Sequence, residues 1–325
     1  MNSLYEQAYD KVLGANTIAL TTHINTDGDA VGSTLGLYHY LVSIGKNVDV
    51  FIDSVIPENL ITLDGVSEIN NKKFKNYDLL ICLDSADEFR LGKNRNLYLD
   101  YKLYSIQFDH HDTANSSYAK LNIVEKISST CELVAEFLFE MKATITKEIA
   151  RCLITGIYTD TGRLSYSSVS PETVIVVSKL LDEANMNIEE VTYSLNNSLT
   201  YKEFLIRKMA YTKVEFYENN SIAIVCLTYE DIQRYDIELF MTKSLIDIVL
   251  PLKDVKLIAL MTEFTPNTVF CSFRSKGDIS AKSLAEIYGG GGHLNAAGCK
   301  IRRCIVEAEK KNIIEQATRL IRSSN

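Results

Sequence analysis

Short β-rich runs of apolar residues alternate with amphipathic helical stretches in the first half of this sequence. The pattern begins with a predicted strand over residues 16–22 and continues with helical periodicity over residues 30–44. Because strands that are joined through helices run parallel, the alternation predicts an α/β fold with an N-terminal parallel sheet and helices on both faces. Further strands are predicted at residues 47–52, 78–83 and 104–108, and further helices at residues 129–141 and 147–158.

The length of 325 residues exceeds one ordinary hydrophobic core and predicts two domains. From Pro171 to about Tyr211 the pattern is helical, with polar breaks at residues 185–187 and 196–200. A smaller α/β region follows, with strands predicted at residues 222–227, 255–261 and 268–274 and helices at residues 281–288 and 305–321. We therefore predict an N-terminal domain over residues 1–185, a helical linker over residues 186–212 and a C-terminal domain over residues 213–325, with the active site in the cleft between the domains.

The composition is that of a globular protein, with 46% hydrophobic and 23% charged residues. No apolar run approaches the ~20 residues that a membrane span needs. The first ten residues carry Glu6 and Asp10 and lack the basic region, followed by an apolar core, that a secretory signal peptide has. We therefore expect a cytoplasmic protein with no membrane partner.

The net charge of −8 argues against long duplex nucleic acid as a partner, because phosphate binding needs clustered Lys and Arg. The seven cysteines form no Cys-x-x-Cys pair, which predicts reduced core residues and no structural zinc.

Acidic and histidine residues stand where the predicted strands end. His23, Asp84 and Asp109 each follow directly on a predicted strand, at the edge of an open α/β sheet where ligands bind. Asp27 and Asp29 lie in the next turn, where Gly28 lets the backbone bend so that both carboxylates can face one point. A single Asp-x-Asp turn is more often a helix cap, but several acidic segments in order within one predicted sheet domain are hard to explain by capping alone.

Carboxylates that converge without cations would repel one another and become protonated. Divalent metal ions remove that problem. Oxygen and imidazole ligands without thiolate favour Mn²⁺ or Mg²⁺, with Co²⁺ as a possible substitute. Two ions roughly 3.5–4 Å apart can share a carboxylate and a hydroxide and activate water for attack on phosphorus. Asp84 is the candidate for the shared carboxylate.

These segments together resemble the motifs of the DHH phosphoesterases, a family named for its Asp-His-His triplet. The resemblance covers most of residues 16–162. The matching segments are His23-x-x-x-Asp27-x-Asp29, Asp84 in Ile81-Cys-Leu-Asp-Ser, the triplet Asp109-His110-His111, and Asp160 in Tyr158-Thr-Asp-Thr-Gly.

The resemblance implies a metal-dependent catalytic domain with two ions and a bridging hydroxide as nucleophile. For the first ion it implies the ligands His23, Asp27 and Asp84. For the second ion it implies the ligands Asp29, Asp84, His110 and Asp160. The implied catalytic set is Asp84, Asp109, His110 and His111. Within this set, Asp109 and His111 would orient ligands and stabilise charge on the substrate phosphate.

A second cluster of polar and glycine residues stands near the C-terminus. Arg274 ends a predicted strand and Ser275 follows it, and Tyr288 is followed by four glycines and His293. At a helix start such glycines can form an anion-binding cradle, although glycine runs are also common as flexible connectors. The block resembles the DHH-associated C-terminal domain, in which the glycine motif, its histidine and an upstream arginine contact substrate. The implied substrate-binding residues are His111, Arg274, Ser275, Gly289, Gly290, Gly291, Gly292 and His293.

Within that family, a chain of this length and domain content is similar to the oligoribonucleases that degrade very short RNAs, many of which also dephosphorylate 3′-phosphoadenosine 5′-phosphate. The resemblance implies short RNA oligomers or phosphorylated nucleotides as substrates, and the chain could form a homodimer. The main alternative is a linear or cyclic dinucleotide phosphodiesterase. Pyrophosphatases of the family have a different second domain, and a non-catalytic nucleotide-binding regulator would be expected to have lost a metal ligand.

Overall fold

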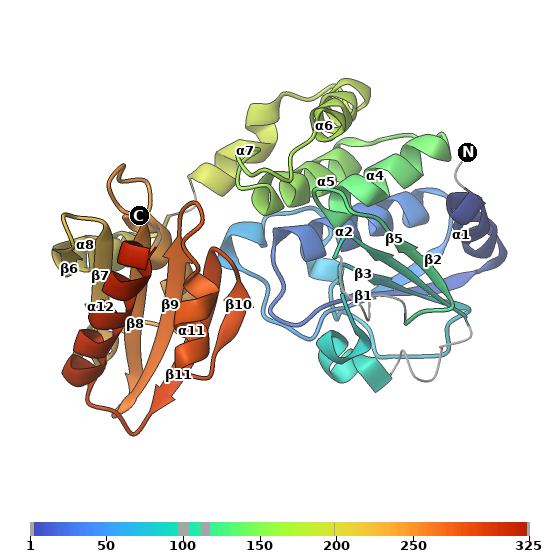
Figure 1. Cartoon of the computed structure of the whole chain (residues 1–325). Coiled ribbons are helices and arrows are strands. Elements are labelled where there is room, and N and C mark those ends of the chain that lie inside the picture. The colour runs from blue at the N-terminus through green and yellow to red at the C-terminus, as the bar shows by residue number, and fades with distance from the viewer. Residues whose placement is uncertain (1–2, 97–103, 112–117, 198, 324–325) are drawn as a thin grey trace. The chain divides into compact units, whose positions relative to one another are not determined.

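The computed structural model describes residues 3–96, 104–111, 118–197 and 199–323 of the chain. They fall into two compact units, Met1–Ser198 and Leu199–Asn325, each with its own sheet and helices (Figure 1). Both units combine helices and strands, which confirms the predicted α/β class.

The first unit is built on a parallel sheet. Its elements in chain order are α1 (Ser3–Gly14), β1 (Thr17–Thr22), α2 (Gly28–Ser43), β2 (Asn47–Phe51), the 3₁₀ helices η1 (Glu58–Leu60) and η2 (Val66–Glu68), β3 (Leu79–Leu83), the 3₁₀ helix η3 (Glu88–Asn94), β4 (Ser105–Asp109), β5 (Leu121–Val124), α4 (Thr130–Glu140), α5 (Lys147–Asp160), α6 (Pro171–Glu183) and α7 (Ile188–Asn196). In the described part of this unit, five strands pair in parallel in the order β2-β1-β3-β4-β5. The parallel sheet predicted from the sequence is therefore confirmed.

Alternate residues of the strands face opposite sides of this sheet. Ile18 and Leu20 of β1 contribute to a large core that also contains buried residues of α1, α2, α4 and α5. Ala19 of the same strand faces a smaller cluster that includes Leu91 of η3. Because both faces are covered, the strands are continuous apolar runs, as expected for a parallel sheet.

Helices α2 and α5 pack antiparallel at very short range because glycines line their contact. A Cβ atom at Gly28 would lie 2.1 Å from Oγ1 of Thr159, and one at Gly32 would lie 2.5 Å from the carbonyl oxygen of Cys152. This packing places the start of α2, with its aspartates, beside the end of α5, where Asp160 stands.

Replacing Gly32 by alanine is expected to destabilise the protein. The added methyl group would meet a backbone oxygen, which cannot rotate away, so the helices must separate at a cost of about 1–3 kcal/mol. Urea unfolding measures the difference. Gly14→Ala is the matched control, since a Cβ there meets nothing within 4 Å. Equal stability of Gly32→Ala and the wild type would contradict the close-packing account.

The second unit has a mixed sheet with helices on both faces. Its elements are α8 (Tyr201–Thr212), β6 (Val214–Tyr217), β7 (Ile222–Leu227), α9 (Tyr229–Tyr235), α10 (Leu239–Thr242), the 3₁₀ helix η5 (Lys243–Ile248), β8 (Leu257–Thr265), β9 (Thr268–Ser275), α11 (Ala281–Ile287), β10 (Gly291–His293), β11 (Ala296–Arg302) and α12 (Val306–Ser323). The strand order among the described residues is β10-β11-β9-β8-β7-β6, with β7 and β8 parallel. One core cluster joins the sheet to α11 and α12, and another joins its opposite face to α8 and α9.

The residues predicted as a linker, 186–212, contain α7 and α8, which cluster with the first and the second unit respectively. In the part of the chain that the structure describes, no helix combines the length and the apolar character needed to cross a membrane.

Candidate metal centre

Polar residues emerge together from three neighbouring strands of the first sheet. His23 follows β1, Asp84 follows β3, and Asp109 is the last residue of β4. The strands are parallel and adjacent, so their carboxyl ends lie at one edge of the sheet. The amide of Asp84 donates a hydrogen bond of 2.9 Å to the carbonyl of Phe108, which holds the turn after β3 against β4.

At this edge, the described residues include three groups of potential metal ligands. Within each group, the ligand atoms all lie within 4.8 Å of one another. The groups are His23, Asp27 and Asp84; Asp84, His110 and His111; and Asp29, His110 and Asp160. Asp84 and His110 each belong to two groups. The structure therefore brings together all six residues to which the family resemblance gave a metal-ligand role.

The distances inside the cluster suit ions that share ligands. Nε2 of His23 lies 3.3 Å from a carboxylate oxygen of Asp84 and 3.8 Å from one of Asp27. Nε2 of His110 lies 3.5 Å from Asp84 and 3.7 Å from both Asp29 and Asp160. The separations of 3.5–3.8 Å exceed ordinary hydrogen bonds, whereas two ligands that each lie about 2.1 Å from one ion are about 3–4 Å apart. Carboxylate and imidazole donors without thiolate fit a divalent ion such as Mn²⁺ or Mg²⁺.

The start of α4 orients two of these carboxylates. The backbone amides of Thr130 and Cys131 donate hydrogen bonds of 2.7 and 2.8 Å to the two carboxylate oxygens of Asp29. The hydroxyl of Thr130 donates a hydrogen bond of 3.0 Å to Asp84. A helix N-terminus stabilises a buried negative charge, so α4 holds Asp29 in place. This role was not predicted from the sequence, although Ser129, the first residue of the predicted helix, is a recognisable N-cap residue, and its side chain does cap α4.

Thr130→Val is expected to weaken metal binding about 10–100-fold, because hydrogen bonds from outside the ligand set commonly orient ligands to this degree. The valine keeps the shape of the side chain but removes the hydroxyl that fixes Asp84. Titration of metal-free protein with Mn²⁺ measures the affinity. Thr130→Ser, which retains a hydroxyl, should restore most of it. If valine and serine bind Mn²⁺ equally well, the hydroxyl has no orienting role.

Two histidines are fixed by backbone carbonyls. Nδ1 of His23 lies 2.7 Å from the carbonyl oxygen of Ile24, and Nδ1 of His110 lies 3.4 Å from that of Ile127. A carbonyl only accepts, so each Nδ1 carries the proton and each Nε2 faces the carboxylates as a free ligand atom.

His111 is paired with the first residue of the triplet, Asp109. Its Nδ1 lies 2.8 Å from a carboxylate oxygen of the fully buried Asp109. This hydrogen bond raises the pKa of His111, although burial opposes the shift. Gln107 donates to the other oxygen of Asp109 at 3.3 Å, which fixes the carboxylate. His111 is thus held in one orientation and favours its protonated form.

The cluster shifts the pKa values of its carboxyl groups in opposite directions. Burial, with repulsion from Asp84, raises the pKa of Asp29 well above its usual range and that of Asp160 to about 6. Burial also acts to raise the pKa of Asp84, but the close approach of the His23 imidazole and the charges of His110 and His111 outweigh it, so this pKa is lowered. Without cations the centre therefore retains protons that divalent ions would displace.

The backbone is strained on both sides of the centre. Asp84 has a φ of 53°, in the left-handed region that residues other than glycine seldom adopt. Beyond Asp160 and Thr161, three successive residues are left-handed: Gly162, Arg163 and Leu164, with φ values of 56°, 63° and 60°. Such strain costs on the order of 1–3 kcal/mol per residue and is concentrated at functional sites.

The predicted substrate-binding residues of the second unit lie on β9 and on or just before β10, and β11 runs between these two strands. Arg274 of β9 is opposite Ala296 of β11, and Ala296 is opposite His293 of β10. The side chain of His293 is outside the described part of the structure. The hydroxyl of Ser275 is buried and donates to the carbonyl of Ile279 at 2.5 Å, so it fixes the loop after β9.

One expectation about the glycine run was wrong. It does not lie at a helix start, because Gly289, Gly290, Gly291 and Gly292 follow the end of α11 and lead into the edge strand β10. Gly289 has a φ of +71°, and the amide of Gly290 donates to the carbonyl of Ala285 at 2.9 Å, a left-handed helix termination. The amide of Gly289 likewise donates to the carbonyl of Glu286 at 3.0 Å, so the amides of both glycines terminate α11 and do not form an anion cradle.

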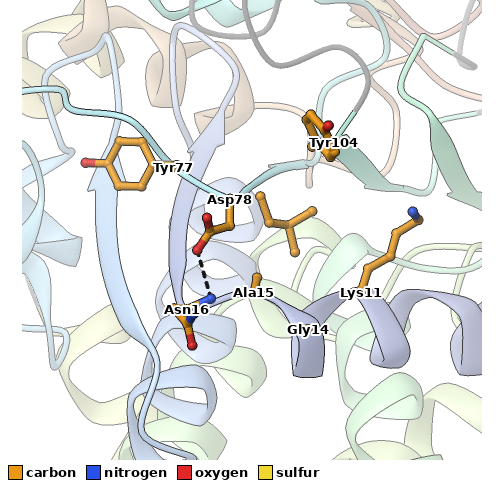
Figure 2. Close-up of a pocket in the computed structure, with 8 residues that line it drawn as sticks. Lys11, Gly14, Ala15, Asn16, Tyr77, Asp78 and Tyr104 are labelled. Carbon is orange, nitrogen blue, oxygen red and sulfur yellow. Dashed lines mark hydrogen bonds between the residues drawn. The ribbon is translucent and has the colours of Figure 1, made fainter.

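A pocket with a volume of about 580 Å³ lies at the opposite edge of the first sheet (Figure 2). Asn16 and Asp78, which precede β1 and β3, line it together with Tyr77 and Tyr104. The carboxylate of Asp78 accepts the backbone amide of Asn16 at 2.9 Å, as the dashed line shows, and so secures the start of β1 (Figure 2). The pocket is therefore separate from the metal-ligand cluster at the carboxyl ends of the strands.

The fold and the cluster define a DHH-family protein. The DHH family N-terminal domain matches residues 17–157, and the DHHA1 domain matches residues 219–323. The chain therefore belongs to the DHH family, as the motifs indicated.

Similar proteins come from several bacteria. A Thermus thermophilus protein named bifunctional oligoribonuclease and PAP phosphatase NrnA is 28% identical over 302 residues, which are 92% of this chain and 88% of the relative. A Mycoplasma genitalium protein with the same name is 28% identical over 303 residues, covering 91% of this chain and 92% of the relative. The crystal structure of an exopolyphosphatase-related protein from Bacteroides fragilis has a TM-score of 0.88 and 27% identity, covering 98% of each chain.

Proposed function

We propose that this chain is a metal-dependent phosphohydrolase that degrades short oligoribonucleotides to mononucleotides and removes the 3′-phosphate of 3′-phosphoadenosine 5′-phosphate. The ligand cluster around Asp84 carries the proposal, because Asp84 and His110 each belong to two of its three ligand groups and so link all three. The relatives named oligoribonuclease and PAP phosphatase support the substrate class, since they match about nine-tenths of this chain.

Two divalent ions, which we take to be Mn²⁺, would bind at the cluster. His23, Asp27 and Asp84 would hold one ion, and Asp29, Asp84, His110 and Asp160 the other. When bound, such ions polarise a phosphoryl oxygen and lower the pKa of water. Asp84 would place both ions by offering one oxygen on the side of His23 and the other on the side of His110.

His111 would bind the phosphate that is cleaved. Its bond to Asp109 fixes the ring and favours a positive charge, which suits an imidazole that donates a hydrogen bond to a developing negative charge. Asp109 acts through His111 as a positioning residue.

The second unit would bind a further phosphate of the substrate. Arg274 and His293 would supply the donors, Gly289–Gly292 would let the backbone approach the phosphate closely, and Ser275 would hold the loop after β9 in shape. A homodimer also stays a prediction, which light scattering of the purified protein tests.

Arg274→Ala is expected to raise KM for a dinucleotide about 10–100-fold with little change in kcat, because a charged hydrogen bond contributes about 1–3 kcal/mol to binding. Steady-state kinetics at saturating Mn²⁺ measure both constants. Arg302→Ala is the matched control, since Arg302 lies at the other end of β11, opposite Thr268. An unchanged KM in Arg274→Ala would contradict a phosphate-binding role.

Product analysis tests the proposed activity. Catalytic amounts of protein with Mn²⁺ are incubated with the dinucleotide pApA and, separately, with 3′-phosphoadenosine 5′-phosphate or pyrophosphate, and the products are separated by chromatography. The proposal expects AMP from the two nucleotides and no phosphate from pyrophosphate. AMP from pApA alone would indicate a dedicated dinucleotide phosphodiesterase, and no turnover of either nucleotide would overturn the proposal.

A further inference from the structure

Two cysteines of the second unit stand directly opposite each other on neighbouring strands. The antiparallel register pairs Cys271 of β9 with Cys299 of β11, and both thiols are free. They belong to the same core: Cys271 is a member of the cluster beneath α11 and α12, and Cys299 packs against it. Opposed residues on antiparallel strands have Cα atoms about 4.5–5.5 Å apart, within the range of about 4.4–6.8 Å that disulfides span.

The pair is of the hydrogen-bonded kind. The amide of Ser275 donates to the carbonyl of Asn295 at 3.0 Å, and such pairs recur at every second residue, which includes Cys271 and Cys299. At such positions the Cβ atoms are about 5.5 Å apart, wider than the about 3.5–4.5 Å that a disulfide spans, so the strands must move closer and the disulfide is easily reduced. Strand β10 pairs only with Ala296–Gly298, so among the described strands β11 has no outer neighbour from Cys299 onward and can make this movement.

The two thiols differ in reactivity. Cys299 is half-buried, whereas Cys271 is 3% exposed. The hydrogen bond between the thiols lowers the pKa of Cys299 and, together with burial, raises that of Cys271. An accessible thiol with a lowered pKa is the one that reacts first with an oxidant.

We propose that Cys271 and Cys299 form a redox-sensitive dithiol, which a low-molecular-weight disulfide oxidises to a reversible cross-strand disulfide. The thiolate of Cys299 attacks one sulfur of the small disulfide, forms a mixed disulfide and releases one small thiol. Cys271 loses its proton and attacks the Cys299 sulfur, which forms the protein disulfide and releases the second small thiol. The protein loses two electrons and two protons, and the small disulfide becomes two thiols.

The disulfide would act on the glycine run. A Cβ atom at Gly290 would lie 2.5 Å from Cβ of Cys299 and 2.2 Å from the carbonyl oxygen of Gly298, so Gly290 rests directly on β11 at this position. Arg274 lies three residues beyond Cys271 on β9. Drawing Cys299 towards Cys271 therefore shifts both flanks of the phosphate-binding residues. This consequence, unlike the dithiol itself, rests on the proposed function.

Mass spectrometry of the full chain tests the dithiol without any activity measurement. After incubation with oxidised glutathione and digestion without reductant, the expected product is one peptide pair linked through Cys271 and Cys299, which a dithiol reductant separates. Cys226→Ser and Cys304→Ser remove the other two cysteines of this core and should leave the linkage intact. Cys271→Ser should stop at glutathione on Cys299, and Cys271→Ala repeats this test with a smaller side chain. A wild type that stays reduced, keeps glutathione on Cys299 or links Cys299 to another cysteine overturns the proposal.

Kinetics test the effect on substrate. The oxidised wild type is expected to show a KM for pApA raised roughly tenfold, reversed by reductant, while Cys299→Ser treated in the same way shows no change. A linked peptide with an unchanged KM would overturn the effect on substrate binding and leave the dithiol established. Absence of hydrolysis in the reduced protein would count against the proposed function, and the peptide linkage would still decide the dithiol.

Discussion

Asp84→Asn is expected to lower the turnover of short RNA roughly a thousandfold or more, equivalent to about 4 kcal/mol of barrier. Asp84 is the carboxylate that two ligand groups share, with one oxygen 3.3 Å from His23 and the other 3.5 Å from His110. An amide has one oxygen and no charge, so it cannot serve both groups. Single-turnover kinetics with pApA at saturating Mn²⁺ measure the loss.

The substitution is chosen to leave the fold intact. Asp84 has a φ of 53°, which asparagine tolerates better than most residues, whereas alanine would add strain. Asp236→Asn is the matched control, because Asp236 has a φ of 49° at the end of α9 and pairs with Lys202 at 2.7 Å, outside the cluster. Wild-type turnover in Asp84→Asn would refute a shared-carboxylate centre, and an equal loss in Asp236→Asn would show that the assay reports folding instead.

Mn²⁺ is expected to raise the melting temperature of the metal-free protein by about 10 °C near pH 7.5. A ligand at a concentration of a hundredfold its Kd stabilises the folded protein by about 2.7 kcal/mol for each site. In a domain of this size, each kcal/mol raises the melting temperature by about 2–4 °C. The ions also relieve the repulsion among Asp29, Asp84 and Asp160. Thermal scans with and without Mn²⁺ measure the difference, with Asp84→Asn as the variant in which it should shrink.

The stabilisation by Mn²⁺ should fall away as the pH falls through about 6. The raised pKa of Asp160 means that this carboxyl is protonated below about 6 in the folded protein, and Asp29 shifts in the same direction. For the metal-free protein, acidification is expected to raise the stability. A carboxyl whose folded pKa is raised costs stability above its unfolded pKa of about 3.9, so acidification from pH 7 to 5 removes part of that cost. Mn²⁺ should thus raise the melting temperature strongly near pH 7.5 and only slightly near pH 5. An effect that grows on acidification would contradict binding by these carboxylates.

Most of the first unit followed from the sequence because its strands are short apolar runs with clear ends. The predicted strand at residues 47–52 is β2, Asn47–Phe51, and the predicted helix at residues 147–158 is α5, which continues to Asp160. Strand β5, Leu121–Val124, was not predicted, since four residues give too short a pattern to recognise.

The residues that support the cluster were harder to predict. Thr130 lies 46 positions from Asp84, so only the fold brings the two together. The glycine run was placed at a helix start because glycine amides at such ends bind anions, yet glycine is more characteristic of helix ends, and Gly289 terminates α11 in that way. The packing of Gly290 on Cys299 likewise depends on the register of β9, β10 and β11, which no local pattern contains.

Calorimetric titration of the metal-free protein with Mn²⁺ tests the two-ion centre most directly. The overlapping ligand groups at Asp84 predict two equivalents of Mn²⁺ per chain, and Asp84→Asn should bind at least one of them much more weakly. Binding of a single equivalent of Mn²⁺ would contradict the two-ion centre. Binding of two equivalents with an affinity that Asp84→Asn leaves unchanged would also contradict it.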